Sequence, residues 1–159
     1  MFLLALLLAC GESGPCKSAQ IDKVISAIQV TSKPQRVALV AQGLVESCTL
    51  APSLKKSLTD IPRLPPEMRT VVAMKTVTED PESWEKACPG GTAMLAQAAT
   101  LGPSGRVKKV VEVCEVDFIE ENEMGQAQDT LLLAILLRSE LKGISTGNRS
   151  ILLRTLSGL

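Results

Sequence analysis

The chain of 159 residues contains no histidine and no tyrosine, and its only aromatic residues are Phe2, Trp84 and Phe118. Without histidine, a Ser-His-Asp triad, a Cys-His pair, a histidine metal site and a histidine pH switch are all excluded. With so few aromatic residues, the chain also lacks the stacking surfaces on which proteins bind sugars and single-stranded nucleic acids. These absences remove several common classes of enzyme and ligand-binding site.

The chain also has no excess of positive or negative charge. Seventeen basic residues balance seventeen acidic ones, so the net charge is zero at pH 7. Proteins that bind nucleic acids usually carry a basic surface, and we therefore expect no nucleic-acid partner. Two small basic pairs, Lys55-Lys56 and Lys108-Lys109, would either touch anionic lipid headgroups or lie on solvated helix faces.

No hydrophobic run is long enough to span a bilayer, which takes about 20 residues. Residues 1–9 are apolar and uncharged, and they fit the hydrophobic region of a signal peptide. The basic residues that usually precede such a region are absent, so either the signal is atypical or, as we predict, an in-frame start codon upstream supplies them. The prediction is a signal peptide over residues 1–9.

The motif Leu7-Leu8-Ala9-Cys10 resembles the lipobox of bacterial lipoproteins. In that family, the cysteine receives a diacylglyceryl group and a peptidase cleaves the chain before it. The resemblance implies lipid attachment at Cys10, a tether over residues 10–15, a helical domain over residues 16–159, and a location in the bacterial cell envelope facing the periplasm. The alternatives are an ordinary signal peptide cut near Ala9, and a buried hydrophobic helix.

Lipidation of Cys10 would leave four cysteines, an even number that suits an oxidising compartment. Cys16 precedes one amphipathic segment and Cys48 ends the next, and Cys88 and Cys114 repeat this arrangement. We predict disulfides Cys16–Cys48 and Cys88–Cys114, each contributing about 3–4 kcal/mol of stability. A zinc site is disfavoured because the cysteines do not form close C-x2-C pairs.

The rest of the chain shows helical periodicity. Apolar residues recur at i, i+3, i+4 and i+7 over residues 21–28, 37–48 and 107–114, and no alternating pattern is sustained. We predict an all-α fold, a compact bundle of about eight to ten short helices in antiparallel hairpins stapled by two disulfides. Residues 131–137 are apolar on every side, and we expect a core helix against which both hairpins pack. The alternative is an exposed apolar groove for a lipid or a partner helix.

Two groups of residues are candidates for catalysis or metal binding. Cys88 precedes Pro89-Gly90-Gly91 at the start of a predicted helix, where a thiol pKa would be lowered, but no base accompanies it. The acidic cluster lacks the spacing of a calcium loop and the aromatic platforms of a glycosidase cleft. We expect no catalytic residue, metal or cofactor. The cluster consists of Glu112, Glu115, Asp117, Glu120, Glu121 and Glu123.

Trp84 lies just before Cys88, so it would either pack over the second disulfide or form the centre of an interface. Residues 84–91 (WEKACPGG) and 152–156 (LLRTL) resemble the helical, cysteine-paired lipoprotein region of some ExbD-like biopolymer-transport proteins. The chain lacks the ExbD core, with its transmembrane helix and adjoining aspartate. The resemblance therefore implies no more than a link to envelope transport.

These features together predict a non-enzymatic envelope lipoprotein that binds another envelope protein. One alternative is a carrier that holds an apolar ligand, such as a lipid, in a cavity near residues 131–137. The other alternative is an enzyme that uses Cys88 or the acidic cluster.

Overall fold

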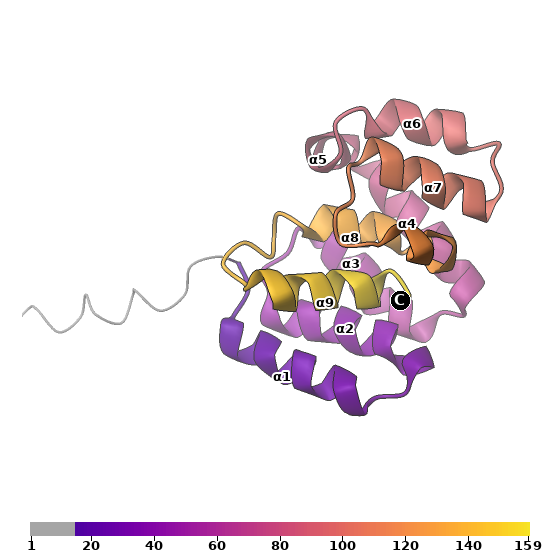
Figure 1. Ribbon diagram of the computed structural model, residues 1–159. Helices are drawn as coiled ribbons and strands as arrows, with labels where there is room; N and C mark the ends of the chain where they lie inside the picture. The colour runs from indigo at the N-terminus through magenta and orange to yellow at the C-terminus, as the bar shows by residue number, and fades with distance from the viewer. Residues whose placement is uncertain (1–14) are drawn as a thin grey trace, which may run out of the picture.

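The computed structural model describes residues 15–159 (Figure 1), so the predicted signal peptide and Cys10 lie outside the described residues. The described chain forms nine α-helices and two 3-10 helices and contains no β-strand, which confirms the predicted all-α fold. The elements are α1 (Ser18–Val30), α2 (Lys33–Ser47), α3 (Pro52–Asp60), η1 (Ile61–Arg63), α4 (Pro66–Glu79), α5 (Pro81–Ala87), α6 (Gly91–Ala98), α7 (Pro103–Val113), η2 (Glu121–Gln126), α8 (Leu131–Leu137) and α9 (Thr146–Leu156).

Proline begins many of these helices, because its fixed φ suits the first turn and its missing N–H is not needed there. Side-chain caps are present at two helices, α5, which also begins with proline, and α9. The Asp80 carboxylate accepts a hydrogen bond from the Ser83 N–H at the start of α5, and the Ser145 hydroxyl accepts one from Asn148 at the start of α9. Within the described residues, no helix has the length and apolar content needed to cross a membrane. The proline-started helices are α2, α3, α4, α5 and α7.

The first hairpin consists of α1 and α2, and the predicted Cys16–Cys48 disulfide closes its open end. The two Cα atoms lie 4.0 Å apart, in an isolated antiparallel bridge. Two backbone hydrogen bonds flank the disulfide, from Lys17 N–H to the Ser47 carbonyl and from Thr49 N–H to the Pro15 carbonyl, each 2.8 Å long. The first described residues therefore lie beside a disulfide that closes this end of the hairpin.

The second hairpin consists of α6 and α7, and the predicted Cys88–Cys114 disulfide joins its ends with a Cα separation of 4.8 Å. The half-buried Arg138 side chain, which follows α8, secures the same corner. Its Nη2 donates hydrogen bonds to the carbonyls of Ala87, at 2.9 Å, and Cys114, at 3.2 Å. These carbonyls end α5 and α7, where a positive charge is favourable.

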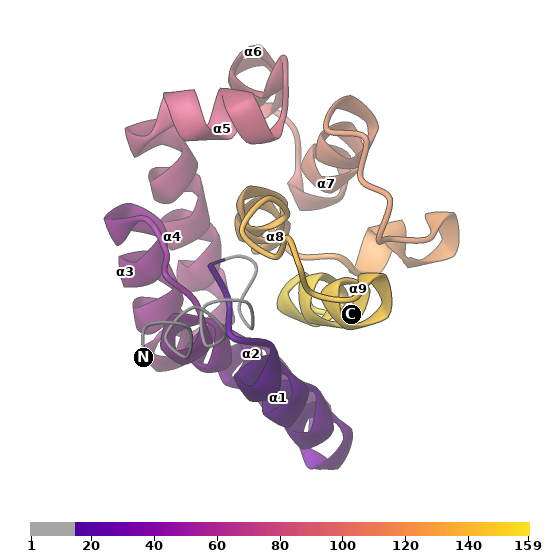
Figure 2. The same cartoon turned by 90° about the vertical axis from the view of Figure 1, so that its left-hand side faces the viewer.

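Helix α8 lies in the middle of the molecule (Figure 2), and six of its seven residues are buried. Its main contacts are with α4, α5 and α9, whereas α9 packs on α1 and α2. The expectation that both hairpins pack directly against α8 is therefore wrong. At about 1.5 Å per residue, seven residues form a helix too short to cover two hairpins, so α9 covers the first hairpin, and α5 and η2 contact the second.

Candidate functional site

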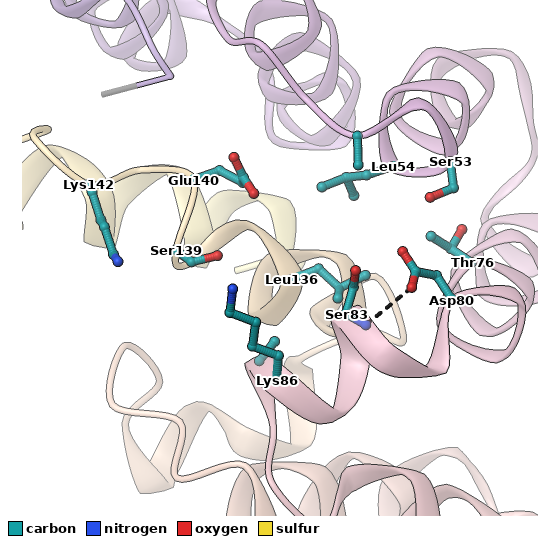
Figure 3. A pocket seen from close by; sticks show the side chains of 12 residues that line it. Ser53, Leu54, Thr76, Asp80, Ser83, Lys86, Leu136, Ser139, Glu140 and Lys142 are labelled. Carbon is teal, nitrogen blue, oxygen red and sulfur yellow. Dashed lines mark hydrogen bonds between the residues drawn. The ribbon is translucent and has the colours of Figure 1, made fainter. Parts of the chain in front are cut away.

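Helices α3, α4 and α5 and the turn after α8 enclose a cleft of about 350 Å³ (Figure 3), which we call the mixed-charge cleft. Eight of its twelve lining residues are polar or charged, among them two acidic and two basic side chains, although apolar atoms make up the larger part of the lining surface. The lining residues are Ala51, Ser53, Leu54, Thr76, Asp80, Ser83, Lys86, Ala87, Leu136, Ser139, Glu140 and Lys142.

One wall of the cleft is held by hydrogen bonds. The buried Thr76 hydroxyl is hydrogen-bonded to the buried hydroxyl of Ser57, which fastens α4 to α3. At the end of α4, Asp80 caps α5 by accepting a hydrogen bond of 3.1 Å from the Ser83 N–H. These contacts fix the positions of Thr76, Asp80 and Ser83, which lie on one side of the cleft in Figure 3.

The opposite wall carries Ser139, Glu140 and Lys142, and the Lys86 side chain extends toward Ser139 (Figure 3). Within the described part of the chain, no ion pair involves Asp80, Lys86, Glu140 or Lys142. Their charges are therefore available to a bound molecule.

The cleft does not contain an assembled nucleophile and base. No hydrogen bond between described residues joins Lys86 to Ser83 or Ser139, although such a bond is the usual geometry of an activated serine. With charges of both signs and several hydroxyl groups, the cleft is chemically suited to a polar peptide segment.

The cleft also borders the first disulfide. The Cys16 sulfur lies 3.4 Å from the carbonyl oxygen of Glu140, although the two residues are 124 positions apart. The start of the described chain is therefore beside the cleft.

Trp84 does not serve as an interface residue on the surface of this domain, because its side chain is fully buried. It packs at the second disulfide instead: a Cβ atom added to Gly91 would lie 2.7 Å from Trp84 Nε1 and 2.9 Å from Cys88 Sγ. The interface prediction for Trp84 is therefore corrected to a core position. Cys88 is also fully buried and is disulfide-bonded, so it provides no free thiol as a nucleophile.

The N-terminus of α6, which was a candidate to activate Cys88, is capped by Glu85. The carboxylate accepts hydrogen bonds from the backbone N–H groups of Gly90, at 2.6 Å, and Thr92, at 3.1 Å. These bonds, that from Gly90 above all, favour the charged form and lower the pKa of Glu85.

Residues of the acidic cluster take part in separate contacts that stabilise the fold. Glu120 and Glu123 form a reciprocal capping box at η2, and Glu123 also pairs with Arg154. The Glu115 carbonyl accepts a hydrogen bond of 3.4 Å from Arg138. Across residues 15–159, no group of three or more acidic or cysteine side chains is arranged to hold a metal ion.

The sequence patterns did not predict two arginine contacts. Arg138 binds the carbonyls at the second disulfide, and burial lowers its pKa. Arg106 forms an ion pair with Asp129. Both contacts join residues more than 20 positions apart, and helical periodicity carries no signal for such pairs.

No protein-family model, curated protein or solved structure matches this chain.

Proposed function

We propose that the protein is a non-enzymatic lipoprotein of the bacterial cell envelope, anchored through Cys10 and facing the periplasm. In this proposal, it binds a segment of another envelope protein in the mixed-charge cleft. A link to envelope transport would fit the resemblance described above.

The pairing of the cysteines is the main observation that supports the proposal. Four of the five cysteines form two disulfides at hairpin ends, as is common for proteins that fold in an oxidising compartment. Cys10 remains, directly behind an apolar segment. The lipid anchor accounts for this fifth cysteine without requiring a free thiol.

The packing around α8 supports a protein partner over an apolar ligand. A side chain that lines a ligand cavity retains accessible surface toward it, but Leu132, Leu133 and Ile135 are at most 2% exposed. Of the α8 residues, Leu136 alone borders the mixed-charge cleft. The cleft itself offers charges and hydroxyl groups, which a lipid chain would leave desolvated and unpaired.

The anchor is tested by measuring the intact mass of the protein purified from bacterial envelopes, before and after reduction. The expected chain begins at Cys10, is heavier by the lipid, and gains four hydrogen atoms on reduction, two for each disulfide. An unlipidated chain with five free thiols would contradict the proposed location.

The partner site is tested by placing a photo-crosslinking amino acid at Lys142 in the cleft and, as a matched control, at Lys108 on the exposed face of α7. We expect a discrete protein adduct from position 142 that is absent from position 108. Lys86→Glu should remove this adduct, because it changes the charge pattern of the cleft. Equal adducts from both positions, or an adduct insensitive to Lys86→Glu, would refute binding in the cleft.

A further inference from the structure

A second cavity, of about 320 Å³, lies at the turn end of the first hairpin, next to the chain end marked C in Figure 1. Helix α1 has 13 residues, so at 1.5 Å per residue this end is about 20 Å from the disulfide and the mixed-charge cleft. Three basic side chains line the cavity, and no acidic side chain does. The lining residues are Lys33, Pro34, Arg36, Val37, Pro66, Arg69, Gln128, Thr155, Gly158 and Leu159.

Backbone carbonyls orient the two arginines in the same way. Arg36 Nε donates to the Thr31 carbonyl at 3.0 Å. Arg69 Nε donates to the carbonyls of Ile61, at 3.2 Å, and Leu64, at 3.1 Å. Both side chains are half-buried. With each Nε atom held by the backbone, the terminal nitrogens of each guanidinium are pre-positioned for another ligand.

No ion pair within the described chain neutralises these charges. Among residues 15–159, Lys33, Arg36 and Arg69 form no ion pair, and the terminal nitrogens of both arginines make no hydrogen bond.

Their positions are also electrostatically unfavourable. Arg36 is the fourth residue of α2 and Arg69 the fourth residue of α4, close to the ends where a helix carries partial positive charge. The first turn of α2 contains no acidic residue to compensate, whereas the first turn of α4 contains Glu67. A bound anion would satisfy the guanidinium groups and relieve this repulsion.

We propose that this cavity binds a phosphate group. Two pre-positioned guanidinium groups and one ammonium group match the several oxygens and the charge of about −1.5 to −2 that a phosphate monoester carries at pH 7. A carboxylate, with one charge and two oxygens, would leave this set of donors incompletely used. The phosphate comes either from a soluble phosphate monoester or from a lipid whose headgroup phosphate is itself a monoester, as in phosphatidic acid, because a phosphodiester carries only one charge. The site is separate from the mixed-charge cleft and does not depend on the proposed envelope function.

The test is calorimetric titration of the full chain, in a non-ionic detergent and at constant ionic strength, with inorganic phosphate. Saturable binding is expected. Lys33→Gln and Arg69→Gln should each weaken it about tenfold, because each removes a charge-assisted contact. Lys33→Gln is informative even if Arg69→Gln disturbs folding, since the Lys33 side chain makes no hydrogen bond within the described residues. Lys108→Gln, which removes an exposed charge from α7, should leave the affinity unchanged.

A short-chain, water-soluble phosphatidic acid, whose phosphate is a monoester, distinguishes the two sources. Binding of both compounds, with the same response to the variants, would support a phospholipid headgroup as the ligand. Binding of inorganic phosphate alone would support a soluble phosphate compound. The proposal is overturned if phosphate does not bind saturably, if Lys33→Gln and Lys108→Gln have equal effects, or if acetate binds as tightly with the same dependence on Lys33.

Discussion

The carboxylate of Asp129 is held by two nitrogens of the Arg106 guanidinium. The distance from Nη2 to Oδ2 is 2.8 Å, and that from Nε to Oδ1 is 3.4 Å. The side chains are 17% exposed for Arg106 and 7% for Asp129, so solvent screens the pair only weakly. The pair connects the first turn of α7 to the segment just before α8.

Asp129→Ala should lower the free energy of unfolding by about 3–5 kcal/mol, because it leaves the Arg106 charge buried without its partner. Urea denaturation measures this change. The exposed pair of Lys56 and Asp60 provides the control: those side chains are 78% and 38% exposed, and Asp60→Ala should cost less than about 1 kcal/mol. Similar losses in the two variants would show that burial of the Arg106–Asp129 pair adds nothing to its effect.

Gly91→Ala should destabilise the protein by about 1–3 kcal/mol, the usual cost of overfilling a packed core. The new methyl group would collide with the Trp84 ring and the Cys88 sulfur. Gly147→Ala in α9 is the matched control, because no heavy atom lies within 4 Å of its added Cβ. Thermal unfolding should show a lower Tm for the first variant and an unchanged or higher Tm for the second.

The Glu85 cap should make part of the stability depend on pH. Backbone hydrogen bonds lower the pKa of Glu85 in the folded protein. The stabilisation is therefore complete above the pKa of an unfolded glutamate, about 4.3, and is lost as the pH falls through the lower folded value. Glu85→Gln should be less stable than the parent at pH 7, and this difference should shrink in acid.

Chemical denaturation from pH 7 to pH 2 measures this difference. Glu82→Gln on the same helix is the control, because its carboxylate accepts no hydrogen bond within the described residues. A difference between the Glu85→Gln variant and the parent that stays constant across the whole range would contradict the capping role.

Removal of the second disulfide by the double substitution Cys88→Ala and Cys114→Ala should lower stability by about 3–4 kcal/mol. The bond closes a loop of 26 residues, and without it the unfolded chain gains conformational freedom. Urea denaturation under non-reducing conditions would measure the loss. If reduction of the parent protein caused no comparable loss, the bond would not be the source of the effect.

Local sequence features were sufficient to predict the helices and the disulfides. Proline at the start of α2 and α7, and a cysteine at the end of each, are visible within one or two turns of chain. The contacts that organise the centre are different, since Asp129 meets Arg106 and Arg138 meets Ala87 only after distant helices have packed. The sequence also left two alternatives for Trp84, and its burial against Gly91 decides between them.

The mixed-charge cleft could not be predicted for the same reason. Its walls come from α3, α4, α5 and the turn after α8, and none of these segments has a distinctive motif. The basic residues of the second cavity, Lys33, Arg36 and Arg69, likewise read as ordinary surface charges until α2 and α4 are placed together.

The corner at Cys16 determines how the domain would respond to mechanical force. Tension applied through the residues that precede Cys16 passes through the sulfur–sulfur bond to Cys48, so it bypasses the 32-residue span between them. Helices α1 and α2 are thus shielded from direct pulling. The fully stretched chain would be shorter by roughly 110 Å than it would be without the bond, at about 3.3–3.6 Å per residue. A tethered protein built in this way would resist unravelling from its anchored end.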